Sequence, residues 1–148
     1  MIPGKMEVWN CTIENPAMLE KAGVSAVPTT WEELYAACDK LKATLNPAQY
    51  ALGLPTGQAL GWATWGMEYN TTGDLVLDEN WKNVQVDNKG WKDLAKFFYT
   101  CYGKGYAPTQ QLTSKGYNDI IEALCQGKLA MTIAGSWSVA EIMNTYPH

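Results

Sequence analysis

Aromatic side chains are the most promising functional groups in this chain of 148 residues, which contains seven Trp and eight Tyr. A flat aromatic face can contact the apolar face of a sugar ring, while neighbouring polar groups bind the hydroxyls. Trp137 stands two residues after Gly135, at the end of an apolar stretch that is typical of a strand. Ligand contact and a place in the core are both open for Trp137, since Trp residues are highly buried on average.

A second aromatic group lies on a helix that we expect to begin near Gln58. Trp62 and Trp65 are three residues apart, so both lie on one face of that helix together with Gln58. An aromatic stripe at this spacing usually packs into the core, which we favour for Trp65 over ligand contact. Gln58 and Trp62 lie nearer the amino end of the helix and are the better ligand candidates, with Trp65 as a third.

The residue patterns that catalysis requires are missing from the sequence. We find no nucleophile elbow, phosphate-binding glycine loop, zinc-protease motif or calcium loop. The only histidine is the final residue, His148, and the neighbouring carboxylates Glu32 and Glu33 do not face each other on a helix. We therefore predict that the chain is not an enzyme.

The four cysteines, at positions 11, 38, 101 and 125, do not have the spacing of a metal site. The sequence contains no Cys-x-x-Cys pair with a nearby histidine, so we predict neither a metal nor another cofactor. Cys38, Cys101 and Cys125 fall on the apolar faces of expected helices. Because an unpaired cysteine behaves as a small hydrophobic residue, we favour buried free thiols, with disulfides as the alternative.

Composition limits the class of partner. The chain has 11 basic and 15 acidic residues and a formal net charge of −4, without a basic run that would attract nucleic acid or an anionic membrane. Its longest apolar stretches, such as 129–134, are far too short to span a membrane. The amino terminus lacks the charged and apolar segments of a secretory signal, so we expect a soluble chain that carries no signal peptide.

The length of the chain is that of one ordinary domain, and helices outnumber strands in the expected pattern. Apolar periodicity and turn residues predict helices over 16–22, 31–44, 58–69, 88–102, 114–125 and 136–146. Strands are expected over 5–10, 50–54 and 128–134, with a small hairpin formed by 75–77 and 84–86. These elements predict a helix-rich α/β fold with helices around a small sheet.

Local signals also predict how some of these helices begin and which faces they bury. Thr29 or Thr30 should cap the helix that begins at Trp31. The side chain of Glu32 or Glu33, three residues on, should in turn accept a hydrogen bond from the backbone amide of the capping threonine. The inward residues expected in the helices over 88–102 and 136–146 are Trp91, Leu94, Ala95, Phe98, Cys101, Tyr102, Val139, Ile142 and Met143.

Two motifs, in a fixed order, resemble those of a known family. The first is a helix end at Gly23 followed by Pro-Thr-Thr-Trp-Glu-Glu-Leu over 28–34. The second is Gly-Lys-Leu-Ala-Met over 127–131, followed by Gly135 and Trp137. Their order and spacing resemble the extracellular solute-binding proteins of ATP-driven (ABC) importers, in the carbohydrate-binding group related to maltodextrin-binding protein. The resemblance covers roughly positions 6–146.

The resemblance implies a fold, partners and a site. Family members are two-lobed and more than twice as long, so residues 1–148 would form a single domain, an incomplete lobe of a type II periplasmic-binding-protein-like fold. Such a lobe would bind a small solute, a carbohydrate in this group, and would serve a membrane permease from the periplasm or the cell exterior. Trp137 and the segment that contains Thr56 and Gln58 would border the ligand cleft, whereas Trp9 and Asn10 would support the entering strand.

Two functions follow from this resemblance. In such proteins the solute binds between two lobes and favours their closed state, so a lone lobe, which keeps part of the contacts, should bind sugar weakly or undetectably. The alternative is a free-standing interaction module derived from the lobe. It would self-associate, for example as a homodimer, through the surface that the missing lobe leaves exposed.

Overall fold

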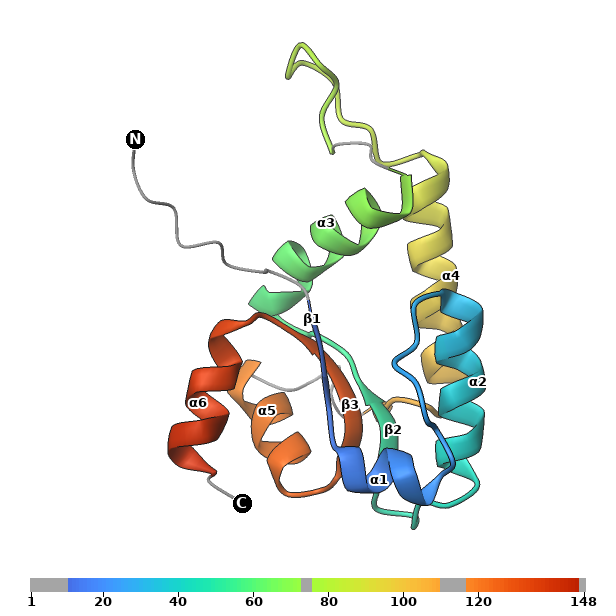
Figure 1. Cartoon of the computed structure of the whole chain (residues 1–148). Helices are drawn as coiled ribbons and strands as arrows, with labels where there is room; N and C mark the ends of the chain where they lie inside the picture. The colour runs from blue at the N-terminus through green and yellow to red at the C-terminus, as the bar shows by residue number, and fades with distance from the viewer. Residues whose placement is uncertain (1–10, 73–75, 110–116, 147–148) are drawn as a thin grey trace.

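The computed structural model describes residues 11–72, 76–109 and 117–146. The strand expected over 5–10, which includes Trp9 and Asn10, and the terminal His148 lie outside these residues. The elements follow one another in the order β1 (Cys11–Glu14), α1 (Pro16–Lys21), α2 (Trp31–Lys42), β2 (Tyr50–Gly53), α3 (Gln58–Thr72), α4 (Lys89–Gly103), α5 (Tyr117–Cys125), β3 (Leu129–Ala134) and α6 (Trp137–Thr145) (Figure 1).

β3 is the central strand of a three-stranded sheet with the order β1-β3-β2. β2 runs parallel to β3, with Leu52 opposite Met131, and β1 runs antiparallel to it, with Cys11 opposite Ala134. All six residues of β3 are buried, which fits a sequence that is apolar except for Thr132, whose hydroxyl donates to the carbonyl of Gly53. β1 is missing from the elements expected from the sequence, because four residues carry too short a pattern and their order depends on pairing with β3.

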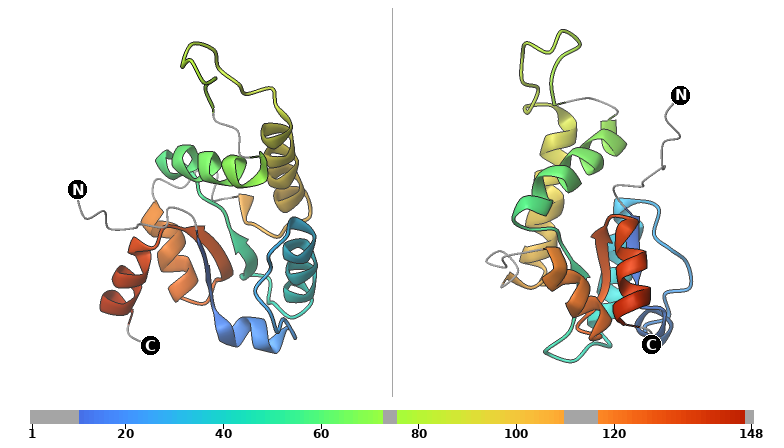
Figure 2. Two further views of the ribbon diagram at one scale, coloured as in Figure 1. Left: turned by 45° about the horizontal axis from the view of Figure 1, so that its top comes forward. Right: turned by 90° about the vertical axis from the view of Figure 1, so that its left-hand side faces the viewer.

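Helices lie on both sides of this sheet (Figure 2). The larger core cluster joins residues of α1, α2 and α4 to the sheet, and it includes Leu41, Met131 and Phe97. The smaller cluster joins α5 to the sheet through Ile120 and Leu124, with α6 packed against it. The expected helix-rich α/β arrangement around a small sheet is therefore confirmed.

The buried face of α4 differs by one position from the predicted stripe. Leu94 is buried as expected, but Phe97, which the prediction leaves out, is only 1% exposed, and its ring centroid lies 4.3 Å from that of Trp31. Phe98 is half-buried and Ala95 is exposed. The sequence offers two consecutive phenylalanines, and contact with α2 selects the one that faces Trp31.

The outward face of α6 also differs from the prediction. Val139 and Met143, which are expected inward, are 47% and 70% exposed. Ile142 packs against α5 and the sheet, as predicted, but the helix turns Ser138 rather than Val139 and Met143 into the protein. Ser138 and Ile142 are one helical turn apart, so they share a face that excludes Val139 and Met143.

The helix starts follow the local signals closely. Asn15, Thr30 and Asn88 are the N-caps of α1, α2 and α4, and each side chain accepts a hydrogen bond from the amide three residues on. The carboxylate of Glu33 reciprocates by accepting bonds from the amide of Thr29, at 2.7 Å, and from its hydroxyl, at 2.8 Å. The capping arrangement of α2 therefore uses both threonines.

The segment from α3 to α4 is longer in helix and shorter in strand than expected. α3 continues through the polar residues over 70–72, where the prediction ends the helix. The expected hairpin is present as one antiparallel bridge between Leu77 and Val84.

Cys38, Cys101 and Cys125 are free thiols, as predicted, and the first two are buried. Among the residues described, no helix combines the length and the apolar composition that crossing a bilayer requires.

Candidate ligand-binding site

β2 and β3 end at the same edge of the sheet because they run parallel, with Gly53 opposite Thr132. The chain leaves β2 for α3 through a loop that contains Thr56, and it leaves β3 for α6 just before Trp137 (Figure 1). The amino end of β1 pairs with the carboxyl end of β3, so β1 begins there too. Ligands of open α/β sheets bind outside the carboxyl ends of the strands. We call this region, formed by residues 54–58 and 135–137, the carboxyl edge.

Trp137 is the first residue of α6, and 37% of its surface is exposed. Its ring lies against the buried Gly135, where a Cβ atom would fall less than 3.0 Å from three of the ring atoms. An aromatic ring held on one side and open on the other can offer a flat face to a ligand. The structure thus places Trp137 where the sequence predicts an aromatic residue at the end of a strand.

Thr56 lies at the carboxyl edge but is 4% exposed. The chain turns into α3 at Gly57, whose φ of +60° belongs to the left-handed region that favours glycine. The first turn of the helix is closed by the amide of Leu60, which donates to the carbonyl of Gly57. Thr56 therefore stands at the start of the helix that carries the other predicted site residues.

Trp65 is 58% exposed, although its helical spacing favours the core. The described buried residues of α3 are Ala59, Ala63, Thr64, Met67 and Glu68, and a rotation of 100° per residue puts positions 58, 62 and 65 on the side of the helix opposite the centre of this buried arc. The side chains of Gln58 and Trp62 are not among those described. Their backbone positions follow Thr56 along α3, away from the sheet.

A cavity of about 420 Å³ lies beside Thr56, between α3 and α4. Its lining is formed by Pro55, Thr56, Gly57, Leu60, Thr64, Trp91, Leu94, Ala95, Phe98 and Tyr102. Sequence reasoning misses this cavity because it assigns the α4 residues of the lining to the core. The volume is that of a small-molecule pocket, but the walls are mainly apolar, which suits the hydroxyl groups of a sugar less well than the carboxyl edge does.

Burial raises the pKa of Tyr102, which lines the cavity beside Thr56. Burial raises the pKa of Glu14, which stands at the opposite end of β1, and burial raises the pKa of the core thiols Cys38 and Cys101 to about 12. Within the described parts of the chain, no three His, Cys, Asp or Glu side chains are grouped so that they could hold a metal ion.

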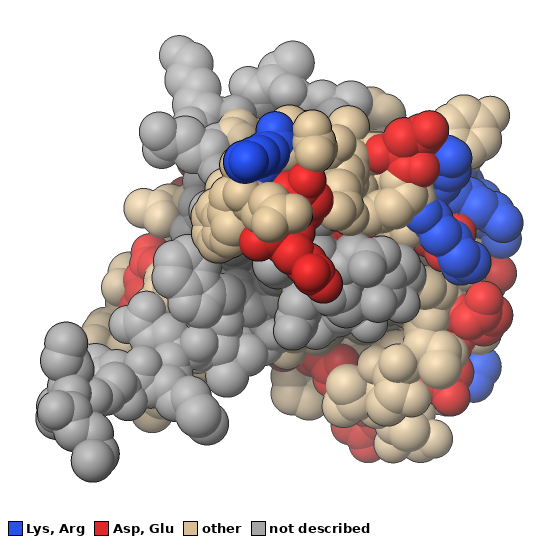
Figure 3. All heavy atoms as spheres, turned by 90° about the horizontal axis from the view of Figure 1, so that it is seen from above, with Lys and Arg blue, Asp and Glu red and all other residues tan. Residues whose placement is uncertain are grey.

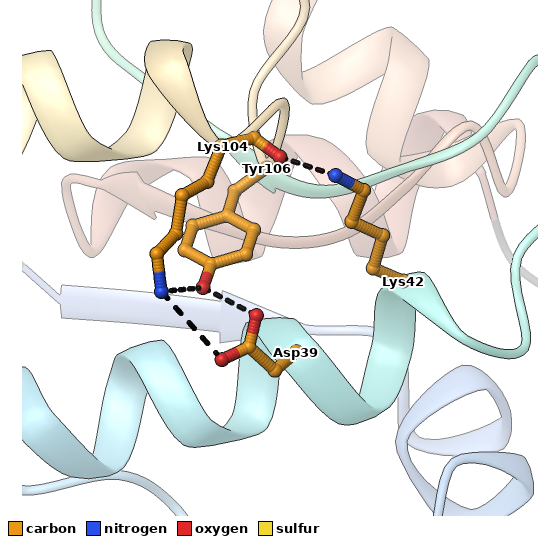
Figure 4. A network of polar contacts seen from close by, with 4 residues as sticks. All are labelled: Asp39, Lys42, Lys104 and Tyr106. Atoms are coloured by element: carbon orange, nitrogen blue, oxygen red, sulfur yellow. Dashed lines mark hydrogen bonds and ion pairs between the residues drawn. The ribbon is translucent and has the colours of Figure 1, made fainter.

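A polar network joins α2 to the segment after α4 (Figure 4). The buried hydroxyl of Tyr106 donates to Asp39 at 2.5 Å and lies 3.0 Å from the Lys104 ammonium, which is 3.8 Å from the same carboxylate. The ammonium of Lys42 donates to the carbonyl of Lys104. These contacts fix one helix against another, so we assign the network to the scaffold.

The chain is similar to solute-binding proteins of known structure. One from Thermotoga lettingae TMO, solved with alpha-D-tagatose, is 26% identical, with a TM-score of 0.76 over 94% of this chain and 37% of its own. The GacH receptor of Streptomyces glaucescens, solved unliganded and with acarbose, is 25% identical, with a TM-score of 0.74 over 93% of this chain and 33% of its own. UgpB of Mycobacterium tuberculosis, solved with glycerophosphocholine, shares the fold at 20% identity. Its TM-score is 0.75, and the match covers 94% of this chain and 34% of UgpB.

The solved proteins are longer than this chain. It spans about a third of the length of each of the three. No curated protein sequence matches it significantly. The model of the bacterial extracellular solute-binding protein family, however, matches residues 4–147, nearly the whole sequence. The chain therefore belongs to the bacterial extracellular solute-binding protein family.

Proposed function

We propose that this chain is part of one lobe of the solute-binding protein of an ABC importer and that it binds a carbohydrate without changing it chemically. The observation that carries this proposal is the convergence of Trp137 and Thr56 at the carboxyl edge of a chain from this family. The tagatose complex of the Thermotoga protein and the acarbose complex of GacH support the choice of a sugar-like solute.

In this proposal Trp137 supplies the aromatic face on which a sugar ring rests. Gln58, Trp62 and Trp65 border the same solute along α3, and Thr56 lies where the helix begins. Residues 1–148 form one domain, which works outside the cytoplasm and presents its bound solute to a membrane permease.

The mechanism is closure of two lobes around the solute. A ligand that contacts both lobes favours the closed state by its higher affinity for that state, and the permease recognises closure. A lone lobe makes only its own share of the contacts. A Kd of about 1 µM corresponds to a binding free energy of about −8.2 kcal/mol. If two lobes contributed equally to this free energy, one lobe alone would supply about −4.1 kcal/mol and bind with a Kd of about 1 mM.

The proposal is tested by saturation-transfer NMR, which detects weak binding, with tagatose, glucose, maltose and acarbose as probes. We expect millimolar binding of at least one of them and its loss in Trp137→Ala. The matched control is Tyr99→Ala, because Tyr99 is an aromatic residue of α4 that is 81% exposed and lies outside the carboxyl edge. Equal binding by the wild type and Trp137→Ala contradicts the role proposed for Trp137. Micromolar binding by this chain contradicts the two-lobe mechanism.

The alternative function, a self-associating module, is favoured by one observation. Val139 and Met143 form an exposed apolar pair on the outer face of α6, where a second copy of the chain could pack. Sedimentation tests it: concentration-dependent dimerisation that Met143→Glu abolishes would support the module, and a monomer at every concentration would exclude it.

A further inference from the structure

A second cavity, of about 410 Å³, lies where β1 leads into α1. Its walls come from Glu14 at the end of β1, from α1 and from the segment 23–27 that follows this helix. We call it the Glu14 cavity. It lies at the lower end of the molecule in Figure 1, whereas the carboxyl edge lies at the upper end. None of the functions discussed so far uses this cavity.

Hydrogen bonds hold the outer wall of the cavity in place. The chain reverses after α1 at Gly23, whose φ of +67° belongs to the left-handed region, and the amide of Gly23 donates to the carbonyl of Glu20 at 2.9 Å. The amide of Val24 donates to the carbonyl of Leu19, also at 2.9 Å. From α2, the ammonium of Lys40 donates to the carbonyl of Gly23 at 3.4 Å. Because the wall is already ordered, a ligand would not have to fix it on binding.

The carboxylate of Glu14 has unused acceptor capacity. Ile13 packs with the smaller core cluster on the α5 side of the sheet, so alternation along β1 directs Glu14 to the other side, toward α1. Its Oε1 atom is closed to solvent and has no hydrogen-bond partner among the described residues, and Oε2 is not closed off in this way. Burial raises the pKa of Glu14, since a half-buried carboxylate without a partner is disfavoured. A cation beside it would remove this penalty.

The lining combines this negative charge with apolar walls. Its charged residues are Glu14 and Glu20, both acidic, and its apolar side chains include Leu19, Val24 and Val27. None of the ion pairs between described residues involves either glutamate. The opposite end of the molecule differs, because Lys side chains lie there beside Asp and Glu (Figure 3). An acidic group among apolar side chains fits a ligand with a positive end and an aliphatic body.

We propose that the Glu14 cavity is a second small-molecule site and that it binds a primary aliphatic amine. The ammonium donates to the carboxylate of Glu14, and the alkyl chain lies against Leu19 and Val24. A compact ammonium with three donors satisfies a carboxylate that has no other partner, and the volume is within the range of small-molecule pockets. The site is separate from the carboxyl edge, so it does not rest on the proposed carbohydrate function.

The test follows the side-chain carboxyl signal of Glu14 in carbon-13-labelled protein by NMR at pH 7, assigned with Glu14→Gln. The probe is n-pentylamine, with 1-pentanol as the same chain without the charge and ammonium chloride as the charge without the chain. We expect n-pentylamine to shift the Glu14 signal with a millimolar Kd and both controls to bind at least about tenfold more weakly. Saturation with n-pentylamine should also lower the pKa of Glu14, because a neighbouring cation favours the carboxylate.

Two variants separate the carboxylate from the shape of the cavity. Glu14→Gln keeps the shape and removes the charge, so it should weaken n-pentylamine binding about tenfold, measured on the methyl signals of Leu19 and Val24. Glu20→Gln removes the other acidic group of the lining. Because Glu20 is exposed, this change should weaken binding no more than about twofold.

Four outcomes overturn the inference. Equal shifts with 1-pentanol would show a cavity for any alkyl chain, and equal shifts with ammonium chloride would show a site for any cation. Equal binding by the wild type and Glu14→Gln would remove the carboxylate from recognition. A Glu14 signal that moves with protein concentration in the absence of amine would show that a lysine of a second copy fills the cavity. Each of these results leaves the proposed carbohydrate site untouched, so the two proposals can fail separately.

Discussion

The ring of Trp137 lies against the Cα atom of Gly135, two residues earlier in the chain. A Cβ atom at this position would be closer than 3.0 Å to three ring atoms, which side chains essentially never allow. The glycine is thus required by packing, because the aromatic ring occupies the volume of the absent side chain. This contact limits the orientations that the indole can adopt at the carboxyl edge.

We predict that Gly135→Ala displaces the indole of Trp137. The ring is the far end of a side chain that is 37% exposed, so it can move away, and the unfolding free energy should fall by less than about 1.5 kcal/mol. The indole N–H signal of Trp137 should shift, and any sugar binding should weaken. Gly61→Ala is the control: a Cβ atom there meets nothing within 4 Å, and alanine should stabilise α3 by about 0.5–1 kcal/mol. An unchanged Trp137 signal in Gly135→Ala would contradict the packing argument.

The start of α2 offers a prediction on stability. Thr30→Ala removes the hydroxyl that accepts from the amide of Glu33 at 3.2 Å, so one amide of the first turn loses its partner. We expect a loss of about 1 kcal/mol in the unfolding free energy, measured by urea denaturation. Thr30→Ser keeps the hydroxyl and should remain within a few tenths of a kcal/mol of the wild type. Equal losses in both variants would show that the hydroxyl is not the cause.

The Tyr106 hydroxyl should make the protein sensitive to alkaline pH. Burial, followed by the hydrogen bond to Asp39, raises the pKa of Tyr106 above its ordinary value of 10. Above pH 10 the unfolded chain loses this proton before the folded protein does, so the contribution of Tyr106 to stability is present below pH 10 and declines as the pH rises through the folded-state pKa. Tyr106→Phe should cost about 1 kcal/mol at pH 7 and should flatten the decline above pH 10.

Urea denaturation between pH 7 and pH 11 measures both effects. Tyr99→Phe makes the same change at a tyrosine that is 81% exposed, and it should follow the wild-type curve. If Tyr106→Phe and the wild type lose stability in parallel above pH 10, the buried hydroxyl is not the titrating group responsible.

Much of the fold could be predicted because it is encoded locally. Asn15, Thr30 and Asn88 cap helices through bonds to amides three residues away, and the five apolar residues of β3, with the buried Thr132 among them, mark a buried central strand. The misses involve choices that depend on tertiary contact. The preference of α4 for Phe97 over Phe98 depends on Trp31, and the four residues of β1 become a strand through pairing with β3.

The sequence allows the residues of the candidate site to be named, but not their arrangement in space. The sequence places Trp137 after a strand, but the parallel pairing of β2 with β3 brings it to the same edge as Thr56. The exposure of Trp65 could not be predicted from spacing. It depends on which side of α3 meets α4.

The half-buried carboxylate of Glu14 leads to a prediction for acidic pH. Its Oε1 atom has no hydrogen-bond partner among the described residues, and burial raises its pKa above 4.5. The folded protein therefore holds this proton more tightly than the unfolded chain, and the charged form at pH 7 lowers stability. Glu14→Gln should be more stable than the wild type at pH 7, with the difference shrinking as the pH falls toward 4. Glu20→Gln, at an exposed position of α1, should show no such difference, and a less stable Glu14→Gln would contradict the argument.

The core thiols should resist alkylation in the folded protein. Cys38 and Cys101 are both fully buried, and burial raises the pKa of each to about 12, so about one molecule in ten thousand carries either thiolate at pH 8. Iodoacetamide at pH 8, followed by mass spectrometry of peptides, should label Cys125 before Cys38 and Cys101, since Cys125 is partly exposed. Cys38 and Cys101 should be labelled at rates that follow unfolding and should react fully in denaturant. Labelling of Cys38 as fast as Cys125 in the native state would show that the contact between α2 and α4 opens far more readily than its packing implies.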